Sequence, residues 1–244
     1  IITIIDNALE NGYTVAWASD VSEDGFTSSG IGVVPDIERI VKGSDYARWM
    51  KDENADVRHG VAKSMYQIFI SSDGNLLTST NALLGNLQKD TQYRIREIVY
   101  TTLAKLGAHY GLETFKTTIE PLFFNYITDN VSSVRATGIS SLKFLIEKFG
   151  VNWIINTLIP KLQSFLQQPK TSYLNRLCII NSLAVCGNYL ESKQLNNDFL
   201  LPFLLKCFKD KILKLKFVTI KTIQKIYKNF DSNGKEKITS SIKR

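Results

Sequence analysis

Residues 89–96 read KDTQYRIR, in which Asp90 is followed, after five intervening residues, by Arg96. This pattern of an aspartate, five residues and a basic residue returns along the chain. It occurs as KDENADVR at 51–58, TDNVSSVR at 128–135 and KDKILKLK at 209–216, while KTSYLNR at 170–176 carries Lys170 in the aspartate position. The basic residues are separated by 38, 39, 41 and 40 positions. A fixed period in this range is typical of a solenoid, in which each unit buries its apolar face against its neighbours.

Each cassette lies between two apolar segments that predict helices. The segment after the second cassette has Ile95, Ile98, Val99, Leu103 and Leu106 on one helical stripe. A shorter apolar run precedes the cassette, so each unit is expected to be helix A, a turn and helix B. The predicted fold class is all-α, an α-solenoid of about five repeats. We expect these repeats at about 37–74, 79–111, 118–150, 157–190 and 198–230 within a solenoid over residues 37–244.

The turn residues support this division. An aspartate between helices can accept N–H bonds at the start of the next helix, and glycine is common just past a helix end. Gly111, Gly150 and Gly187 are therefore expected near the ends of B helices, and Pro121, Pro160 and Pro202 near the starts of A helices. For each cassette's basic residue two interpretations stay open: it pairs with an aspartate of a neighbouring repeat, or it is a solvated surface charge. The residues predicted to act between repeats are Asp52, Arg58, Asp90, Arg96, Asp129, Arg135, Asp210 and Lys216.

The chain resembles a known group of helical repeat proteins. The stretches that carry the resemblance are KDTQYRIREIVYTTLAKLGAHYG (89–111), DNVSSVRATGISSLKFLIEKFGVNW (129–153), IPKL (159–162), YLNRLCIINSLAVCG (173–187) and LPFLLKC (201–207). Their pattern is that of HEAT repeats, and residues 51–230 resemble the C-terminal third of the scaffold (A, or PR65) subunit of protein serine/threonine phosphatase type 2A. The resemblance implies a non-enzymatic, cytoplasmic or nuclear scaffold whose turns dock a phosphatase catalytic subunit and other protein subunits.

The resemblance also implies partner-binding residues in the turns. Tyr93 and Arg94 match an aromatic–arginine pair, and Tyr173, Asn175 and Arg176 match a pattern with asparagine in place of histidine. Ser132 stands where the family has a tyrosine, and Leu213 and Lys214 replace smaller, neutral residues. Aromatic residues and arginine are frequent hot spots of interfaces. For Tyr93 and Tyr173 the alternative is that they only cap the core between repeats.

The first 36 residues do not fit the helical pattern. TVAWASDV (14–21) and GIGVVPD (30–36) each predict a short strand. Residues 1–49 resemble a segment of the aminopeptidase C and bleomycin hydrolase family of cysteine peptidases, but the first cysteine of the chain is Cys178, so no catalytic residue of that family can be placed here. Three explanations stay open: a fusion, an assembled sequence, or a misleading resemblance in which 37–50 is helix A of the first repeat.

Composition restricts the remaining function classes. The 244 residues carry a net charge of +7, and residues 201–244 hold 12 basic and 3 acidic side chains. Two interpretations of this basic end stay open. It is a lysine-rich solvated face, or it belongs to an adaptor that binds an acidic partner, a cytoskeletal surface or, less expected, nucleic acid. The sequence contains no apolar run long enough to span a membrane, no secretory signal and no catalytic or metal-binding motif. We therefore expect no enzyme activity, no cofactor, no metal, no small-molecule substrate, and buried reduced cysteines.

Overall fold

The computed structural model describes residues 13–17, 31–35, 49–71, 84–168 and 171–242. Within these ranges the chain is predominantly α-helical, as the apolar periodicity predicted. The chain divides into two compact units, Ile1–Leu83 and Leu84–Arg244, and each is described by itself.

The described residues of the first unit form two strands and one long helix. Strand β1 (Tyr13–Trp17) pairs antiparallel with β2 (Ile31–Pro35), with Val15 opposite Val33. Both strands overlap the stretches whose residue pattern predicted strands. Helix α4 (Ala55–Ser71) follows the first cassette. The predicted helix over 37–50 lies almost wholly outside the described residues.

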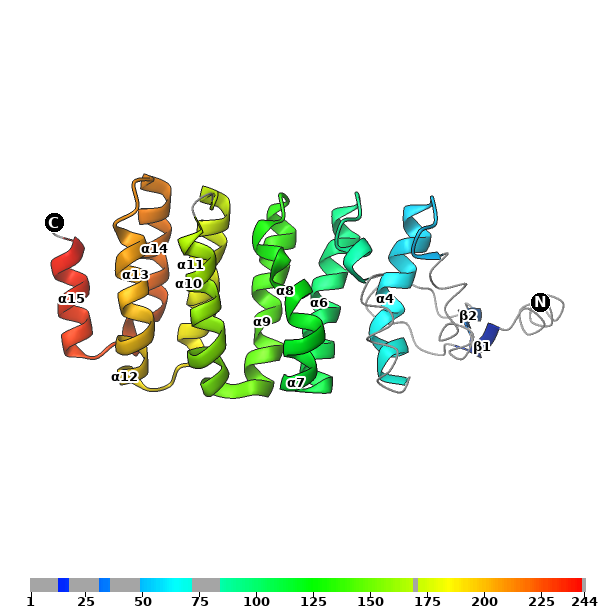
Figure 1. Ribbon diagram of the computed structural model, residues 1–244, viewed down its shortest axis with the longest axis horizontal. Helices are drawn as coiled ribbons and strands as arrows, with labels where there is room; N and C mark the ends of the chain where they lie inside the picture. The colour runs from blue at the N-terminus through cyan, green and yellow to red at the C-terminus, as the bar shows by residue number, and fades with distance from the viewer. Residues whose placement is uncertain (1–12, 18–30, 36–48, 72–83, 169–170, 243–244) are drawn as a thin grey trace. The chain divides into compact units, whose positions relative to one another are not determined.

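The second unit contains four long helices, one after each remaining cassette. They are α6 (Tyr93–Tyr110), α9 (Ser132–Trp153), α11 (Tyr173–Tyr189) and α14 (Leu213–Ile226). Within this unit α6 packs against α9, α9 against α11 and α11 against α14, so chain neighbours are also neighbours in space (Figure 1). The turns before these helices all lie along the upper edge of Figure 1.

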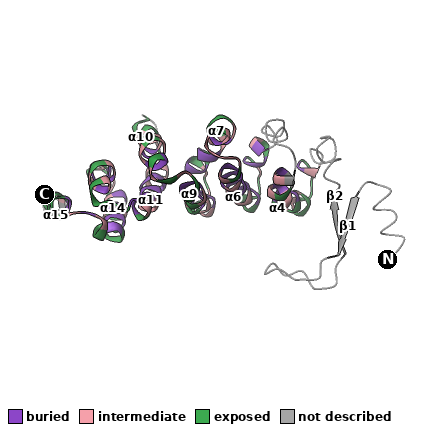
Figure 2. Ribbon diagram, turned by 90° about the horizontal axis from the view of Figure 1, so that it is seen from below, coloured by how far each residue is buried: buried purple, intermediate pink, exposed green. Residues whose placement is uncertain are grey.

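Shorter helical runs connect the long helices. These runs are α7 (Leu112–Thr114), η1 (Phe115–Ile119), α8 (Glu120–Phe123) and η2 (Phe124–Thr128) after α6; η3 (Ile154–Leu158) and α10 (Ile159–Gln167) after α9; α12 (Lys193–Leu195), η4 (Asn196–Leu200) and α13 (Leu201–Phe208) after α11; and η5 (Tyr227–Asn229) and α15 (Ser232–Ile242) after α14. In Figure 2 the buried residues lie where these helices meet one another. The core is therefore a row of helix–helix contacts.

The three prolines lie in the first turn of α8, α10 and α13, near the start of a helix as expected. The π-helices that precede them were not expected. The helical run that reaches Pro121 already begins at Leu112 and passes through a five-residue π-helix, η1. Pro160 and Pro202 likewise follow π-helices, η3 and η4. Proline lacks the N–H of the regular helical bond, and its ring crowds the carbonyl four residues earlier. A π turn stands directly before the helix that holds each proline, and the helical run continues through the proline.

Two of the three glycines end helices as predicted. Gly111 and Gly150 adopt positive φ angles of 89° and 74°, a conformation that side chains disfavour, and each interrupts the helix there. Gly187 was expected in the same role but stays inside α11. A Cβ at residue 187 would come within 2.8 Å of the Ile226 side chain. Glycine at 187 therefore permits close packing of α14 on α11.

Candidate protein-interaction surface

The aspartate of each cassette caps the turn before the following helix. Oδ1 of Asp90 accepts the backbone N–H of Gln92 at 2.8 Å. The same bond to the residue two positions later is made by Asp52, Asp129 and Asp210. A carboxylate here satisfies an N–H group ahead of the helix and lies near the positive end of the helix dipole.

The spacing of five residues between aspartate and arginine has a direct geometric cause. Nη1 of Arg96 donates to the backbone oxygen of Asp90 at 2.6 Å, so the arginine folds back over its own turn. Arg58 and Arg135 make the same bond to Asp52 and Asp129, also at 2.6 Å. Each arginine therefore closes the turn that its own aspartate opens.

The other side of the Arg96 guanidinium binds the next turn of the chain. Nε and Nη2 donate to the two carboxylate oxygens of Asp129 at 2.8 and 3.0 Å. The two side chains are only 9% and 6% exposed. The hydrogen bond to Asp129 is the main cause that raises the pKa of Arg96. A bidentate ion pair that is largely buried fixes the distance between successive turns more firmly than a surface ion pair does.

The same connection recurs between the turns before α11 and α14, and it is interrupted at Arg135. Arg176 donates to the carboxylate of Asp210. Arg135 is equally buried, at 7% exposed, yet no carboxylate pairs with it within the described residues. The sequence explains the difference, because position 170 of the cassette carries lysine instead of aspartate. The structure thus brings together Arg96 with Asp129 and Arg176 with Asp210, and leaves Arg135 and Lys216 without such a partner among the residues it describes.

A second set of residues is exposed to solvent and occupies the equivalent position in each of the four long helices of this unit. Tyr93, Ser132, Tyr173 and Leu213 are the first residues of α6, α9, α11 and α14, three positions before the basic residue of each cassette. We refer to these four residues as the helix-start row. Tyr93, Tyr173 and Leu213 are 39%, 48% and 79% exposed, and Ser132 is exposed as well. Each residue of the helix-start row lies three positions before the basic residue of its cassette. The buried ion pairs that fix the basic residues therefore also fix the spacing of the exposed row.

The neighbours of the row add charge. The guanidinium of Arg94 lies 6.0 Å from the centre of the Tyr93 ring, a cation–π distance, and both side chains are exposed. A hydrogen bond to Tyr93 raises the pKa of Arg94. Lys214 is exposed next to Leu213. The backbone N–H of Asn175 is bound by the capping hydroxyl of Ser172 at 3.2 Å. An aromatic and cationic edge of this kind is suited to binding a protein surface.

The described residues were also compared with the requirements of a metal site and of a membrane span. No three histidine, cysteine or acidic side chains there lie close enough together to hold a metal ion. Cys178, Cys186 and Cys207 are buried and unpaired, and burial raises the pKa of each thiol to about 12. None of the described helices is both long and apolar enough to cross a membrane.

A comparison with protein families gives one match. The profile described as "PIK3R4-like, middle domain" matches residues 33–236, which is most of the chain. The chain belongs to the PIK3R4-like family. The PIK3R4-like middle domain therefore includes every cassette and every long helix described above. A search of curated proteins found no match.

The PIK3R4-like match does not test the resemblance to the phosphatase scaffold or the resemblance to the cysteine peptidases, so both stay predictions. The match begins at residue 33, within β2. Sequence reasoning also missed one feature of this PIK3R4-like chain, an apolar groove along α14 that includes Phe217 and Ile220. The available signal was the spacing of Leu213, Phe217 and Ile220, which places them on one side of the helix.

Proposed function

We propose that residues 37–244 form a HEAT-type α-solenoid and that this solenoid is a non-enzymatic scaffold. In this proposal the helix-start row and its neighbours bind a protein partner. The repeated cassette supports it, as do the packing of α6 on α9, α9 on α11 and α11 on α14 and the turns of this unit along one edge. Stacked repeats of this kind hold their turn residues at fixed spacing over a long surface.

The observation that carries the proposal is the exposure of Tyr93 and Tyr173 at equivalent positions. Each tyrosine lies three residues before an arginine that is bonded to the following turn, Arg96 and Arg176 respectively. An exposed aromatic ring contributes little to folding at the rim of a helix, whereas it contributes strongly to an interface. The rings are also presented with little loss of conformational freedom, because a tyrosine side chain has only two rotatable angles.

The partner we propose is a serine/threonine phosphatase catalytic subunit. The resemblance of residues 51–230 to the type 2A scaffold, the Tyr93–Arg94 pair and Tyr173 support this choice. Ser132 and the Leu213–Lys214 pair depart from that family's pattern, so binding is expected to rest on α6 and α11 more than on α9 and α14.

The test is a binding assay between the 244-residue chain and the type 2A catalytic subunit. The Tyr93→Ala/Arg94→Ala double variant should lose most of the binding, since truncated hot spots commonly cost 2 kcal/mol or more, roughly thirtyfold in Kd. Lys148→Ala is the matched control, an exposed cation at the opposite end of α9. No binding by the unchanged chain, or equal loss in both variants, would overturn the choice of partner.

A second candidate function rests on charge. Residues 201–230 contain eight lysines and one acidic residue, Asp210, which is already bonded to Arg176. An adaptor for an acidic partner would use this basic surface, and its affinity would fall steeply as salt is raised. Docking through tyrosine anchors would change much less with salt, so a salt titration distinguishes the two functions.

A further inference from the structure

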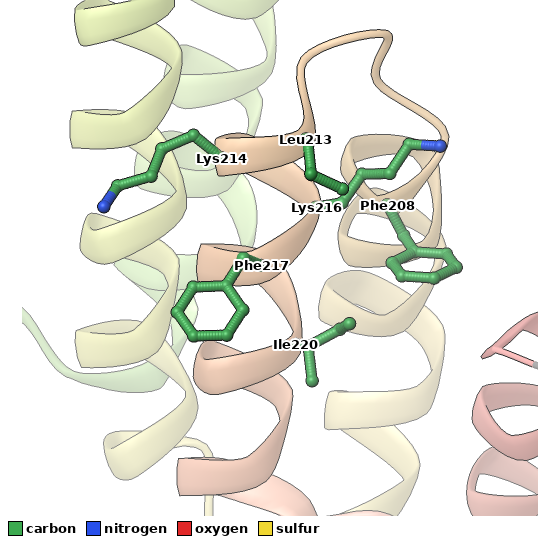
Figure 3. Close-up of a pocket in the computed structure, with 6 residues that line it drawn as sticks. All are labelled: Phe208, Leu213, Lys214, Lys216, Phe217 and Ile220. Atoms are coloured by element: carbon green, nitrogen blue, oxygen red, sulfur yellow. The ribbon is translucent and has the colours of Figure 1, made fainter.

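The first observation is an uncovered apolar groove on α14. Leu213 and Phe217 are 79% and 51% exposed, which is unusual for large apolar side chains on a helix that is otherwise packed. With Ile220 and with Phe208 at the end of α13 they line a groove of about 560 Å³ (Figure 3). We name this feature the α14 groove. Its volume is large enough to receive several side chains of another helix.

The second observation comes from the repeat itself. Ile220 is the eighth residue of α14. The eighth residues of α6 and α11, Tyr100 and Ile180, are 2% and 1% exposed, while the eighth residue of α9, Ile139, is half-buried. Tyr100 is covered by the helical run that follows α6, because Tyr126 of that run meets its ring edge-on at 6.1 Å. The helix after α14, α15, packs on α13, and none of its residues lines the groove. The α14 groove therefore has the register at which the following helical run covers Tyr100 on α6.

The rim of the α14 groove carries positive charge. Lys216 is the fourth residue of α14, the place that Arg96 and Arg176 hold in α6 and α11. Both arginines bind an aspartate of the following turn. The groove is lined by Lys214 and Lys216 but by no acidic residue, and α14 as a whole carries four lysines and no carboxylate. The groove thus presents an apolar floor with an unmatched positive rim.

We propose that the α14 groove binds an amphipathic helix of a partner protein, and that a carboxylate of that helix, or of the turn after it, pairs with Lys216. The apolar face of the helix would cover Phe208, Phe217 and Ile220 as Tyr126 covers Tyr100. Helix-in-groove recognition of this kind uses apolar anchors spaced along one helical face. A hollow lined by side chains favours a helix over a flat lipid surface, and the register favours a carboxylate at Lys216.

The proposal can be tested with a segment of this chain that already covers the equivalent position on α6. A synthetic peptide of residues 115–131 carries both Tyr126 and Asp129. In fluorescence anisotropy with the 244-residue chain, this peptide should bind saturably. Ile220→Lys should abolish binding, and Lys216→Asp should weaken it about tenfold by removing a charge-assisted contact. A peptide with Asp129→Lys should restore binding to the Lys216→Asp chain, since the charges are then exchanged.

The matched control is Lys225→Asp, which makes the same charge change on an exposed part of α14 outside the groove. It should leave peptide binding unchanged. Circular dichroism of each variant establishes that the fold is kept. Equal loss in the Lys216 and Lys225 variants would show unspecific charge attraction and overturn the proposal, as would no peptide binding. Binding of the chain to vesicles of phosphatidylcholine and phosphatidylserine that depends on Ile220, without peptide binding, would replace the helix with a membrane surface.

Discussion

The ring of Tyr126 lies directly against the backbone of Gly138. A Cβ added at residue 138 would approach Cγ of Tyr126 to 2.1 Å, far inside van der Waals contact. Tyr126 cannot turn away easily, because it is fully buried and its hydroxyl is 3.0 Å from the Ser182 hydroxyl on α11. The ring also meets Tyr100 of α6. One side chain thus connects α6, α9 and α11 and requires a glycine at 138.

Replacement of Gly138 by alanine should therefore destabilise the protein. The added methyl group has no space, so overpacking should cost about 1–3 kcal/mol in the free energy of unfolding, measured by urea denaturation. Gly60→Ala in α4 is the control, because a Cβ at Gly60 meets nothing within 4 Å. That variant should be stabilised by up to about 1 kcal/mol through helix propensity. A Gly138→Ala protein as stable as the unchanged chain would contradict the packing described here.

A single substitution should complete the interrupted ion-pair series. Arg135 faces α11, since its positive charge opposes the rise that burial causes in the pKa of Cys178. Position 170 is the aspartate position of its cassette, so Lys170→Asp should supply the missing carboxylate. We expect a gain of about 1–2 kcal/mol in the free energy of unfolding.

The control for this gain is the same Lys170→Asp change in an Arg135→Gln background. If the introduced carboxylate acts through Arg135, the stabilisation should disappear there, and the double-mutant cycle should give a coupling energy. An equal gain in both backgrounds would mean that removal of a lysine, rather than a new ion pair, is the cause.

The buried cysteines predict a fall in stability at alkaline pH. Burial raises the pKa of the Cys186 thiol to about 12, whereas an unfolded cysteine titrates near about 8.5. Because the thiol has a higher pKa in the folded state than in the unfolded state, its contribution to the free energy of unfolding is complete below about pH 8.5. This contribution is lost as the pH rises toward about 12. Between pH 7 and pH 10 the Cys186→Ala variant should lose about 2 kcal/mol less stability than the unchanged chain. The same loss in both proteins would show that this thiol is not protected by the fold.

The cassette was the part of the structure most open to prediction from sequence. The bonds that Asp90 makes within its turn are local, and the return of Asp129 after one period places it opposite Arg96. The π turns before Pro121, Pro160 and Pro202 were not predicted, because an apolar run before a proline looks the same whether the helix begins there or passes through it. Gly187 was misplaced for a similar reason: its role depends on Ile226, which is distant in sequence.

The spacing of Leu213, Phe217 and Ile220 places them on one side of α14, but it does not show that this side is open, because exposure depends on what covers a helix. Ile180 and Ile220 occupy the same register and have the same side chain, yet Ile180 is buried and Ile220 lines an open groove. The helix-start row, by contrast, follows from the spacing alone once the helix boundaries are known.

The most direct test of the scaffold proposal is calorimetric titration of the type 2A phosphatase catalytic subunit into the chain and into Tyr93→Ala, Tyr173→Ala and the double variant. Each tyrosine should cost about tenfold or more in Kd, the two losses should be roughly additive because the rings lie on different helices, and moderate salt should change little. Unchanged affinity in the double variant, or no binding by the unchanged chain at low salt, would contradict the role assigned to the helix-start row.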